Sequence, residues 1–244
     1  MIRLVLTVLF LLIYFICSLP IFLVELILGK INRRARDISS LRIVQFGFKG
    51  ILFFAGTKTT VIGFENIPKD EAVLFVGNHR SYFDIIISYS MMPNLTGYVS
   101  KKEIGKVPIL STWMRFVYCL FLDRDDIKEG LKTILKGIEY IKNGISIAIF
   151  PEGTRRKEPD GVAPFKEGSL KFAEKSGCKI IPIIQNNTEA CMESHTPWIK
   201  KAHTVIEFGE PIDIKELDKE QKKFLGRYVH DIIEKKFEEN KKLV

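Results

Sequence analysis

Cysteine and histidine are scarce in this sequence. Its 244 residues include 4 cysteines and 4 histidines. No two cysteines have the C-x-x-C spacing of a zinc or redox motif, and the sequence has no H-E-x-x-H motif. These absences argue against a disulfide-stapled secreted fold and against the common zinc sites. We expect the cysteines to be buried thiols in a reducing compartment.

Linkers, internal repeats and low-complexity tracts are also missing after residue 60. Charged residues make up 27% of the chain and hydrophobic residues 46%, which excludes intrinsic disorder. The length suits one large domain with its own hydrophobic core. The mean hydropathy of +0.08 is high for a soluble protein.

Charge is absent from a long segment near the N-terminus. Leu4–Val24 contains 21 residues without a charge, which is long enough to cross a hydrocarbon core of about 30 Å. Arg3 precedes this segment. The basic residues that follow it are Lys30, Arg33, Arg34 and Arg36. This pattern predicts a protein of the cell membrane whose remaining residues lie on the cytoplasmic face.

Two membrane arrangements remain open. The segment could form a single span, or Pro20 and Glu25 could interrupt it and Ile43–Gly56 could form the second arm of a re-entrant or interfacial hairpin. A cleaved signal peptide fits less well, because the apolar run is too long and no A-x-A-like site follows. We therefore expect a membrane anchor over residues 1–58 and a second domain over 59–244.

The net charge of +8 is unevenly distributed. Residues 1–60 carry +6, whereas residues 61–212 and 213–244 carry +1 each. The basic excess therefore surrounds the apolar segment, where each Lys or Arg close to anionic headgroups would contribute about 1 kcal/mol. This distribution favours membrane phospholipid over nucleic acid as the partner.

Short β-rich runs alternate with helical patterns after residue 58. This alternation predicts an α/β fold with a mixed, mostly parallel sheet covered by helices. The predicted strands are Thr59–Phe64, Ala72–Gly77, Thr96–Ser100, Tyr118–Leu122, Ser146–Phe150, Lys179–Ile184 and Thr204–Phe208. Helices are expected over Ile85–Met92, from an Asp125 or Asp126 cap to Ile141, over about 166–176, and from Ile214 onward.

The first candidate site follows the second predicted strand and includes His79 and Asp84. If His79 lies in the loop and Asp84 in the first turn of the next helix, the carboxylate can reach one imidazole nitrogen. It would then fix the tautomer and raise the basicity of the other nitrogen. The spacing alone is also typical of an aspartate that merely caps a helix.

Two further candidate loops follow neighbouring strands. Residues 150–155 read Phe-Pro-Glu-Gly-Thr-Arg, in which glycine lets the backbone approach a ligand closely and arginine suits a phosphate. Lys101 and Lys102 follow the third strand, and Arg124 follows the fourth. Solvated lysines and a surface salt-bridge cluster around Arg124 are the alternatives.

Together and in this order, these motifs resemble the glycerolipid acyltransferase family, in particular the bacterial 1-acylglycerol-3-phosphate acyltransferases. The resemblance covers about residues 60–210. It implies acyl transfer from acyl-CoA or acyl-carrier protein to the sn-2 hydroxyl of 1-acylglycerol-3-phosphate, a step of phospholipid biosynthesis that gives phosphatidic acid. No metal and no further cofactor would be needed.

The resemblance also implies roles for individual residues. His79 would be the general base and Asp84 the residue that orients it. The implied substrate-binding residues are Lys101, Arg124, Glu152, Gly153, Thr154 and Arg155. Pro182 would belong to a further family block that is mainly structural.

Two positions depart from the family pattern. Tyr118 stands where the family usually has glycine, and residues 108–111 read P-I-L-S where it usually has P-F-F-G. Both lie on the acceptor side, so another lysolipid or glycerol-3-phosphate stays open as the acceptor.

Two other functions also stay open. One is a membrane-anchored, metal-dependent hydrolase with His79, Asp84 and Glu152 as ligands, although the other three histidines form no ligand-spaced cluster. The other is a non-catalytic lipid-binding protein.

Overall fold

The computed structural model describes residues 1–156, 161–166 and 168–244. Seven strands form one sheet in the order β1-β7-β6-β2-β5-β3-β4. The five strands from β6 to β4 are parallel, β7 is antiparallel to β6, and β1 pairs with β7 in parallel. The strands are β1 Lys58–Ile62, β2 Leu74–Gly77, β3 Thr96–Lys101, β4 Leu120–Leu122, β5 Ser146–Ile149, β6 Ile180–Asn186 and β7 His203–Phe208. The predicted mixed, mostly parallel sheet is confirmed.

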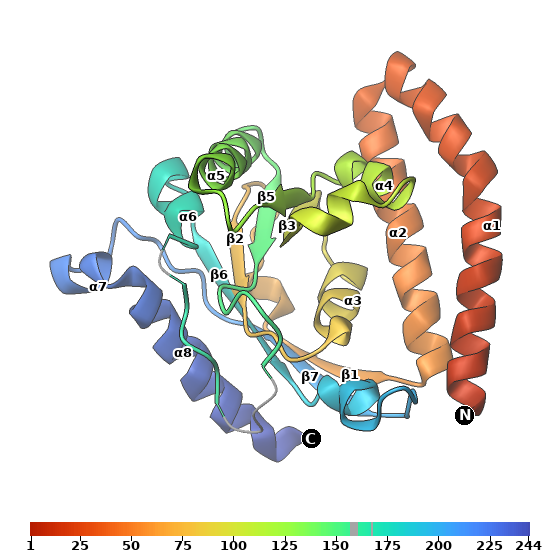
Figure 1. The fold of residues 1–244 in the computed structure, drawn as a ribbon. Coiled ribbons are helices and arrows are strands. Elements are labelled where there is room, and N and C mark those ends of the chain that lie inside the picture. The colour runs from red at the N-terminus through yellow and green to blue at the C-terminus, as the bar shows by residue number, and fades with distance from the viewer. Residues whose placement is uncertain (157–160, 167) are drawn as a thin grey trace.

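Alternating side chains of the central strands supply two separate cores. Val73, just before β2, and Phe75 pack on one face of the sheet, and Leu74 and Val76 pack on the other. Figure 1 shows helices on both faces of the sheet. The first core lies against α2 (Arg33–Ala55) and α3 (Tyr82–Ser90), and the second against α5 (Ile127–Lys142), α6 (Lys171–Ser176) and α8 (Leu225–Asn240).

Helix boundaries follow local capping more closely than hydrophobic periodicity. Asp126 caps α5 as predicted, because its carboxylate accepts hydrogen bonds from the backbone N–H groups of Lys128 and Glu129. The expected C-terminal helix is interrupted at Phe224, which has a non-helical ψ of 41° and separates α8 from α7 (Lys219–Lys223).

Short elements had no clear signal in the sequence. These are α4 (Leu110–Phe116) and the 3-10 helices η1 Phe64–Asn66, η2 Lys102–Lys106, η3 Glu189–Cys191, η4 Glu193–His195 and η5 Lys241–Leu243. Each spans no more than seven residues, so none develops a repeated apolar face.

The N-terminal segment forms a hairpin of two helices, α1 (Ile2–Ile31) and α2, joined at Asn32. The expected interruption at Pro20 and Glu25 is wrong, since α1 continues through both positions. The Glu25 carboxylate is buried and accepts hydrogen bonds from Ser39 Oγ at 2.6 Å and Ser40 Oγ at 3.2 Å. By length and composition, both helices could cross a membrane.

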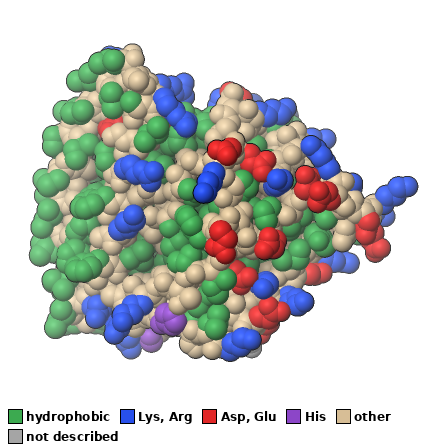
Figure 2. Space-filling model, turned by 180° about the vertical axis from the view of Figure 1, so that it is seen from behind, with side chains coloured by type: hydrophobic (Ala, Val, Ile, Leu, Met, Phe, Trp, Pro, Cys, Tyr) green, Lys and Arg blue, Asp and Glu red, His purple; other side chains and the backbone are tan. Residues whose placement is uncertain are grey.

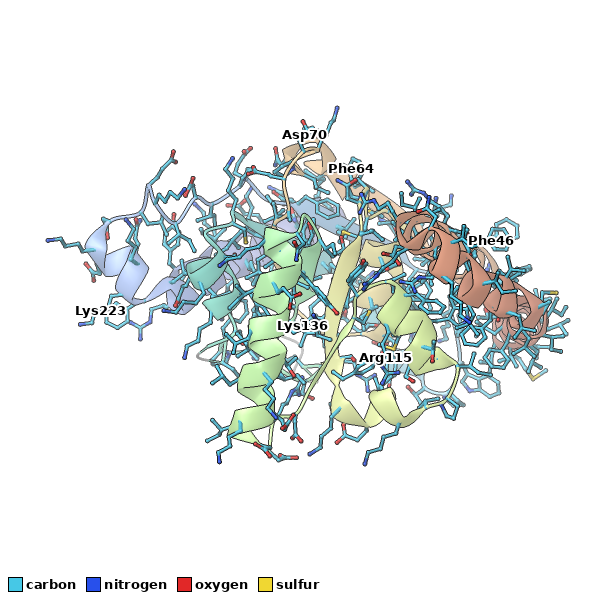
Figure 3. All side chains as sticks on the ribbon, turned by 90° about the horizontal axis from the view of Figure 1, so that it is seen from above. Phe46, Phe64, Asp70, Arg115, Lys136 and Lys223 are labelled. Carbon is cyan, nitrogen blue, oxygen red and sulfur yellow. The ribbon has the colours of Figure 1, made fainter. Side chains whose placement is uncertain are left out.

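Helix α1 buries polar side chains and exposes apolar ones. Its buried residues are Thr7, Ser18 and Glu25, whereas Leu12 is 58% exposed and Ile16 is 65% exposed. A helix on the surface of a water-soluble domain has the opposite pattern. The hydrophobic surface of the hairpin is visible in Figure 2, and the exposed Phe46 of α2 projects outward in Figure 3.

Helix α2 lies between α1 and the rest of the protein. The buried Gln45 side chain donates to the carbonyl of Tyr89 at 3.2 Å and to that of Met92 at 2.8 Å, at the end of α3. In Figure 1 α2 runs alongside α3 and α4, with α1 on its outer side and the hairpin tip above α4. The anchor and the sheet domain therefore share one hydrophobic core.

Tyr118 connects the loop before β4 to this hairpin. It has a left-handed φ of 63°, a conformation that costs a residue other than glycine about 1–2 kcal/mol. Its hydroxyl donates to the buried carboxylate of Asp37 on α2, and its ring packs edge-on against Tyr140. The Tyr118 side chain thus lies against the hairpin and does not line the cavity described below.

Candidate active site

The candidate site begins where β2 ends. The side chain of Asn78 forms two hydrogen bonds of 2.8 Å with the backbone of Gln185, which ties the ends of β2 and β6 together. His79 follows in the loop, and Asp84 lies in the first turn of α3. His79 Nδ1 and Asp84 Oδ2 are 2.8 Å apart, so the carboxylate reaches the imidazole as the spacing predicted.

Asp84 is completely buried and is held by several donors. Its Oδ2 accepts hydrogen bonds from the backbone N–H groups of Arg80 at 2.6 Å and Ser81 at 2.7 Å. Its Oδ1 accepts one from the hydroxyl of Thr188, which follows β6. Thr188 is not identifiable from the sequence alone, because only the sheet order reveals that the segment after β6 lies beside the loop after β2.

The imidazole of His79 is fixed from two sides. Its ring stacks on that of Phe150, with centroids 4.4 Å apart and an interplanar angle of 15°. With Nδ1 facing Asp84, the other ring nitrogen, Nε2, forms no hydrogen bond within the part of the chain that the structure describes. The side chain is 15% exposed. Nε2 is thus the atom able to take a proton from a substrate.

Glu152 supports the backbone of this loop. Its Oε1 accepts a hydrogen bond from the backbone N–H of His79 at 2.5 Å, and its Oε2 accepts one from Ala163 at 3.0 Å. The side chain is 5% exposed. Burial raises the pKa of Glu152 above its usual value, and the two hydrogen bonds oppose this shift. Both oxygens are therefore used within the protein, and Glu152 does not line the cavity at this edge of the sheet.

A cavity of about 350 Å³ lies at the ends of β3 and β4. It is lined by Lys101, Lys102, Glu103, Ile104, Leu122, Arg124 and Asp125. The Arg124 guanidinium donates to the carbonyl of Gly153, so this cavity adjoins the loop after β5. Gly153 has a left-handed φ of 76°, which suits glycine. Two predicted substrate-binding residues, Lys101 and Arg124, thus line one cavity.

Lys102 is paired instead of simply solvated. Its ammonium lies 2.8 Å from Asp123 Oδ1 and 3.3 Å from Asp125 Oδ2. The hydrogen bond that Lys102 donates to Asp123 is the main reason why the pKa of Lys102 is raised, and the same contact lowers the pKa of Asp123. The positive charge of the cavity wall is therefore partly neutralised on this side.

Arg155 and Thr154 lie outside the lining of this cavity. Arg155 donates to Glu193 Oε1 at 3.1 Å and lies 3.7 Å above the ring of Tyr82. Thr154 is exposed. Glu193 also accepts hydrogen bonds from Ser81 Oγ and from the backbone N–H of Tyr82, so it fixes the start of α3. Nothing in the local sequence around Glu193 indicated this contact across 112 residues.

Known proteins resemble this chain in sequence and in fold. The acyltransferase family model matches residues 58–185. A 1-acyl-sn-glycerol-3-phosphate acyltransferase of Borreliella burgdorferi is 31% identical over 187 residues, which are 77% of this chain and 74% of that protein. This chain belongs to the acyltransferase family.

Two further relatives extend the likeness of this acyltransferase to almost its full length. A 1-acyl-sn-glycerol-3-phosphate acyltransferase of Haemophilus influenzae is 28% identical over 212 residues, covering 84% of this chain and 85% of that protein. The crystal structure of PlsC, the 1-acyl-sn-glycerophosphate (LPA) acyltransferase of Thermotoga maritima, is 26% identical and has a TM-score of 0.82. It covers 98% of this chain and 96% of that one. The likeness therefore includes the N-terminal hairpin.

Proposed function

We propose that this acyltransferase transfers an acyl group from a thioester to the sn-2 hydroxyl of 1-acylglycerol-3-phosphate and so forms phosphatidic acid. The observation that carries this proposal is the His79–Asp84 pair. Its Nε2, which forms no hydrogen bond with the described residues, lies on the same sheet edge as a cavity lined by Lys101 and Arg124. The names of the relatives support the same acceptor.

In the proposed reaction His79 acts first as base and then as acid. Nε2 removes the proton of the acceptor hydroxyl while the hydroxyl oxygen attacks the thioester carbonyl. The oxygen–carbon bond forms, the carbon–sulfur bond breaks, and the imidazolium returns the proton to the leaving thiolate. Asp84 stays ionised throughout, and its contact with Nδ1 stabilises the imidazolium.

The phosphate of the acceptor would occupy the cavity beside Arg124. A phosphomonoester carries about −1.5 to −2 charges at neutral pH, and arginine and lysine side chains suit it. Arg124 and Lys101 supply two cations there. Arg155 would join them only by leaving Glu193, and Glu152 would act by holding the backbone of His79.

Thiol release from acyl-CoA or acyl-carrier protein tests both the acceptor and the donor. We expect 1-acylglycerol-3-phosphate to give rapid release, and glycerol-3-phosphate and uncharged lysolipids to give little. The faster of the two donors in the same assay identifies the natural one. Rapid release with a lysolipid that lacks a phosphomonoester, with none from 1-acylglycerol-3-phosphate, would exclude the proposed role of Arg124.

The membrane arrangement best supported is a hairpin that enters one leaflet from the cytoplasmic face. The outer side of α1 is apolar, but α2 is covered on its other side by α3 and α4. Two full spans would draw these helices of the catalytic domain into the hydrocarbon. Loops with unpaired backbone groups are not stable there.

Cysteine labelling at the hairpin tip separates the two arrangements. In a Cys17→Ala background, Ile31→Cys places a thiol at the exposed end of α1. For a one-leaflet hairpin, an impermeant maleimide added to intact cells should not label Ile31→Cys. Lys219→Cys, on α7 in the catalytic domain, is the matched control and should be labelled only after permeabilisation. Labelling of Ile31→Cys in intact cells would show that the hairpin crosses the membrane.

A metal-dependent hydrolase is less well supported. Glu152 uses both oxygens for backbone N–H groups, and Asp84 accepts four hydrogen bonds from His79, Arg80, Ser81 and Thr188. Within the described ranges, one group of side chains could hold a metal ion: His230, Asp231 and Glu234 on α8, which shares no residue with this site. Loss of thiol release in EDTA would favour the hydrolase chemistry instead.

A further inference from the structure

A second basic cavity lies at the end of the hairpin where the chain enters α1. Its volume is about 540 Å³. Met1, Ile2 and Arg3 line it from α1, and Ile199, Lys200 and Lys201 line it from the segment before β7. It shares no lining residue with the cavity beside Arg124. Positive charges far apart in the sequence thus meet next to the apolar anchor.

The segments that build this end of the molecule contain no acidic residue. Residues 1–6, 50–64 and 194–206 have neither Asp nor Glu. Their basic residues are Arg3, Lys58, Lys200 and Lys201. The backbone N–H of Lys58 donates to the carbonyl of Ala202 at 2.9 Å, so the start of β1 lies beside the end of this lysine pair. In Figure 2, blue side chains gather at the lower left, below the green surface of the hairpin, with no red among them.

Exposed apolar side chains surround the same cavity. Ile2 is 74% exposed at its wall, and Trp198, which directly precedes the lining residues, is 43% exposed. Tryptophan beside lysine is typical of the membrane–water interface, where the ring lies at the level of the headgroups. From Ile2 onward the outer side of α1 exposes apolar side chains, so an apolar surface leads away from the cavity along this helix.

We propose that this cavity binds the phosphate of an anionic phospholipid of the bilayer, whose acyl chains lie along the outer side of α1. Arg3, Lys200 and Lys201 supply the positive charge, and the neighbouring apolar surface accepts the chains. The contact holds this end of the hairpin at the headgroups and makes membrane binding dependent on anionic lipid. It goes beyond the proposed acyl transfer, since Lys200 and Lys201 do not line the substrate cavity.

Vesicle flotation of the full-length protein tests this site. Binding is measured on phosphatidylcholine vesicles with and without phosphatidylglycerol, for wild type, Lys200→Gln/Lys201→Gln, and the control Lys215→Gln/Lys219→Gln, whose lysines are exposed near α7. We expect the Lys200/Lys201 variant to lose about 30-fold in affinity for the anionic vesicles, which is about 1 kcal/mol for each lysine. Its affinity for pure phosphatidylcholine should be unchanged, and the control should bind like wild type.

Two results would overturn the inference. One is an equal loss of affinity for anionic vesicles in both double variants, which would mean that the overall positive charge of the protein, and not this cavity, causes the preference for anionic lipid. The other is wild-type binding of the Lys200/Lys201 variant to the anionic vesicles. Thiol release in detergent micelles is measured in parallel. It should be the same for all three proteins, so failure of the lipid site is distinguishable from failure of the proposed acyl transfer.

Discussion

Replacing Thr188 with valine removes the donor to one oxygen of Asp84 and leaves the volume of the side chain almost unchanged. Thr188 and Asp84 are both fully buried, so water cannot replace the lost hydrogen bond easily. A hydrogen bond to a charged group is worth about 1.5–3 kcal/mol. Oδ2 keeps its three donors, His79 Nδ1 and two backbone N–H groups. We therefore expect the carboxylate to stay beside His79 but to be less firmly oriented.

For Thr188→Val we expect a loss of about 1.5–3 kcal/mol in the free energy of unfolding. We expect kcat to fall about tenfold, because about 1.4 kcal/mol of transition-state stabilisation corresponds to a factor of ten. KM for the acceptor should change little, since Thr188 does not line the substrate cavity. Thr188→Ser keeps the hydroxyl and should restore kcat. Steady-state thiol release and thermal unfolding measure both quantities.

The matched control is Thr204→Val. Thr204 is also fully buried, and its hydroxyl pairs with that of Thr59 at 2.9 Å, between β7 and β1. This variant should lose stability and retain kcat. The reasoning would be refuted if folded Thr188→Val kept wild-type kcat, or if the threonine-to-serine variant were as slow as the valine variant.

Three further predictions concern charge and hydrophobicity. Because burial raises the pKa of Glu152 above 4.5, the native state loses stability from this group as the pH rises through the raised value. The melting temperature of Glu152→Gln minus that of wild type should therefore increase from about pH 4 to about pH 7. A melting-temperature difference that does not change with pH would contradict this. Arg124→Gln should raise KM for the acceptor about tenfold or more with a smaller change in kcat, whereas the exposed control Lys128→Gln should behave like wild type. Leu12→Lys/Ile16→Lys should abolish flotation with vesicles, and unchanged flotation would exclude α1 as the lipid-facing helix.

Much of the sheet domain could be predicted from the sequence. All seven strands are present, because buried parallel strands form short apolar runs between polar turns. The pairing of His79 with Asp84 was also predictable, since both residues lie within one strand–helix connection. The pattern of residues close together in the sequence was sufficient to predict the strands and this pair.

Contacts between distant segments were not predictable in the same way. Thr188 and Glu193 reach the start of α3 from the connection between β6 and β7, and a single sequence does not reveal that β6 is the neighbour of β2. The assignment of Glu152 to the substrate is not supported by its contacts, because its two acceptors face backbone N–H groups of the protein. The predicted interruption at Glu25 is wrong because Ser39 and Ser40, which are distant in the sequence, donate hydrogen bonds to its buried carboxylate.

The most direct test of the proposed chemistry is thiol release by a His79→Gln variant with 1-acylglycerol-3-phosphate as acceptor. Glutamine retains a polar side chain but cannot accept and return a proton as imidazole does. We predict a loss of about 10²–10⁴-fold in kcat, with normal thermal unfolding and with His195→Gln unaffected. A folded His79→Gln protein that retains kcat close to wild type would contradict the role of His79 as the general base.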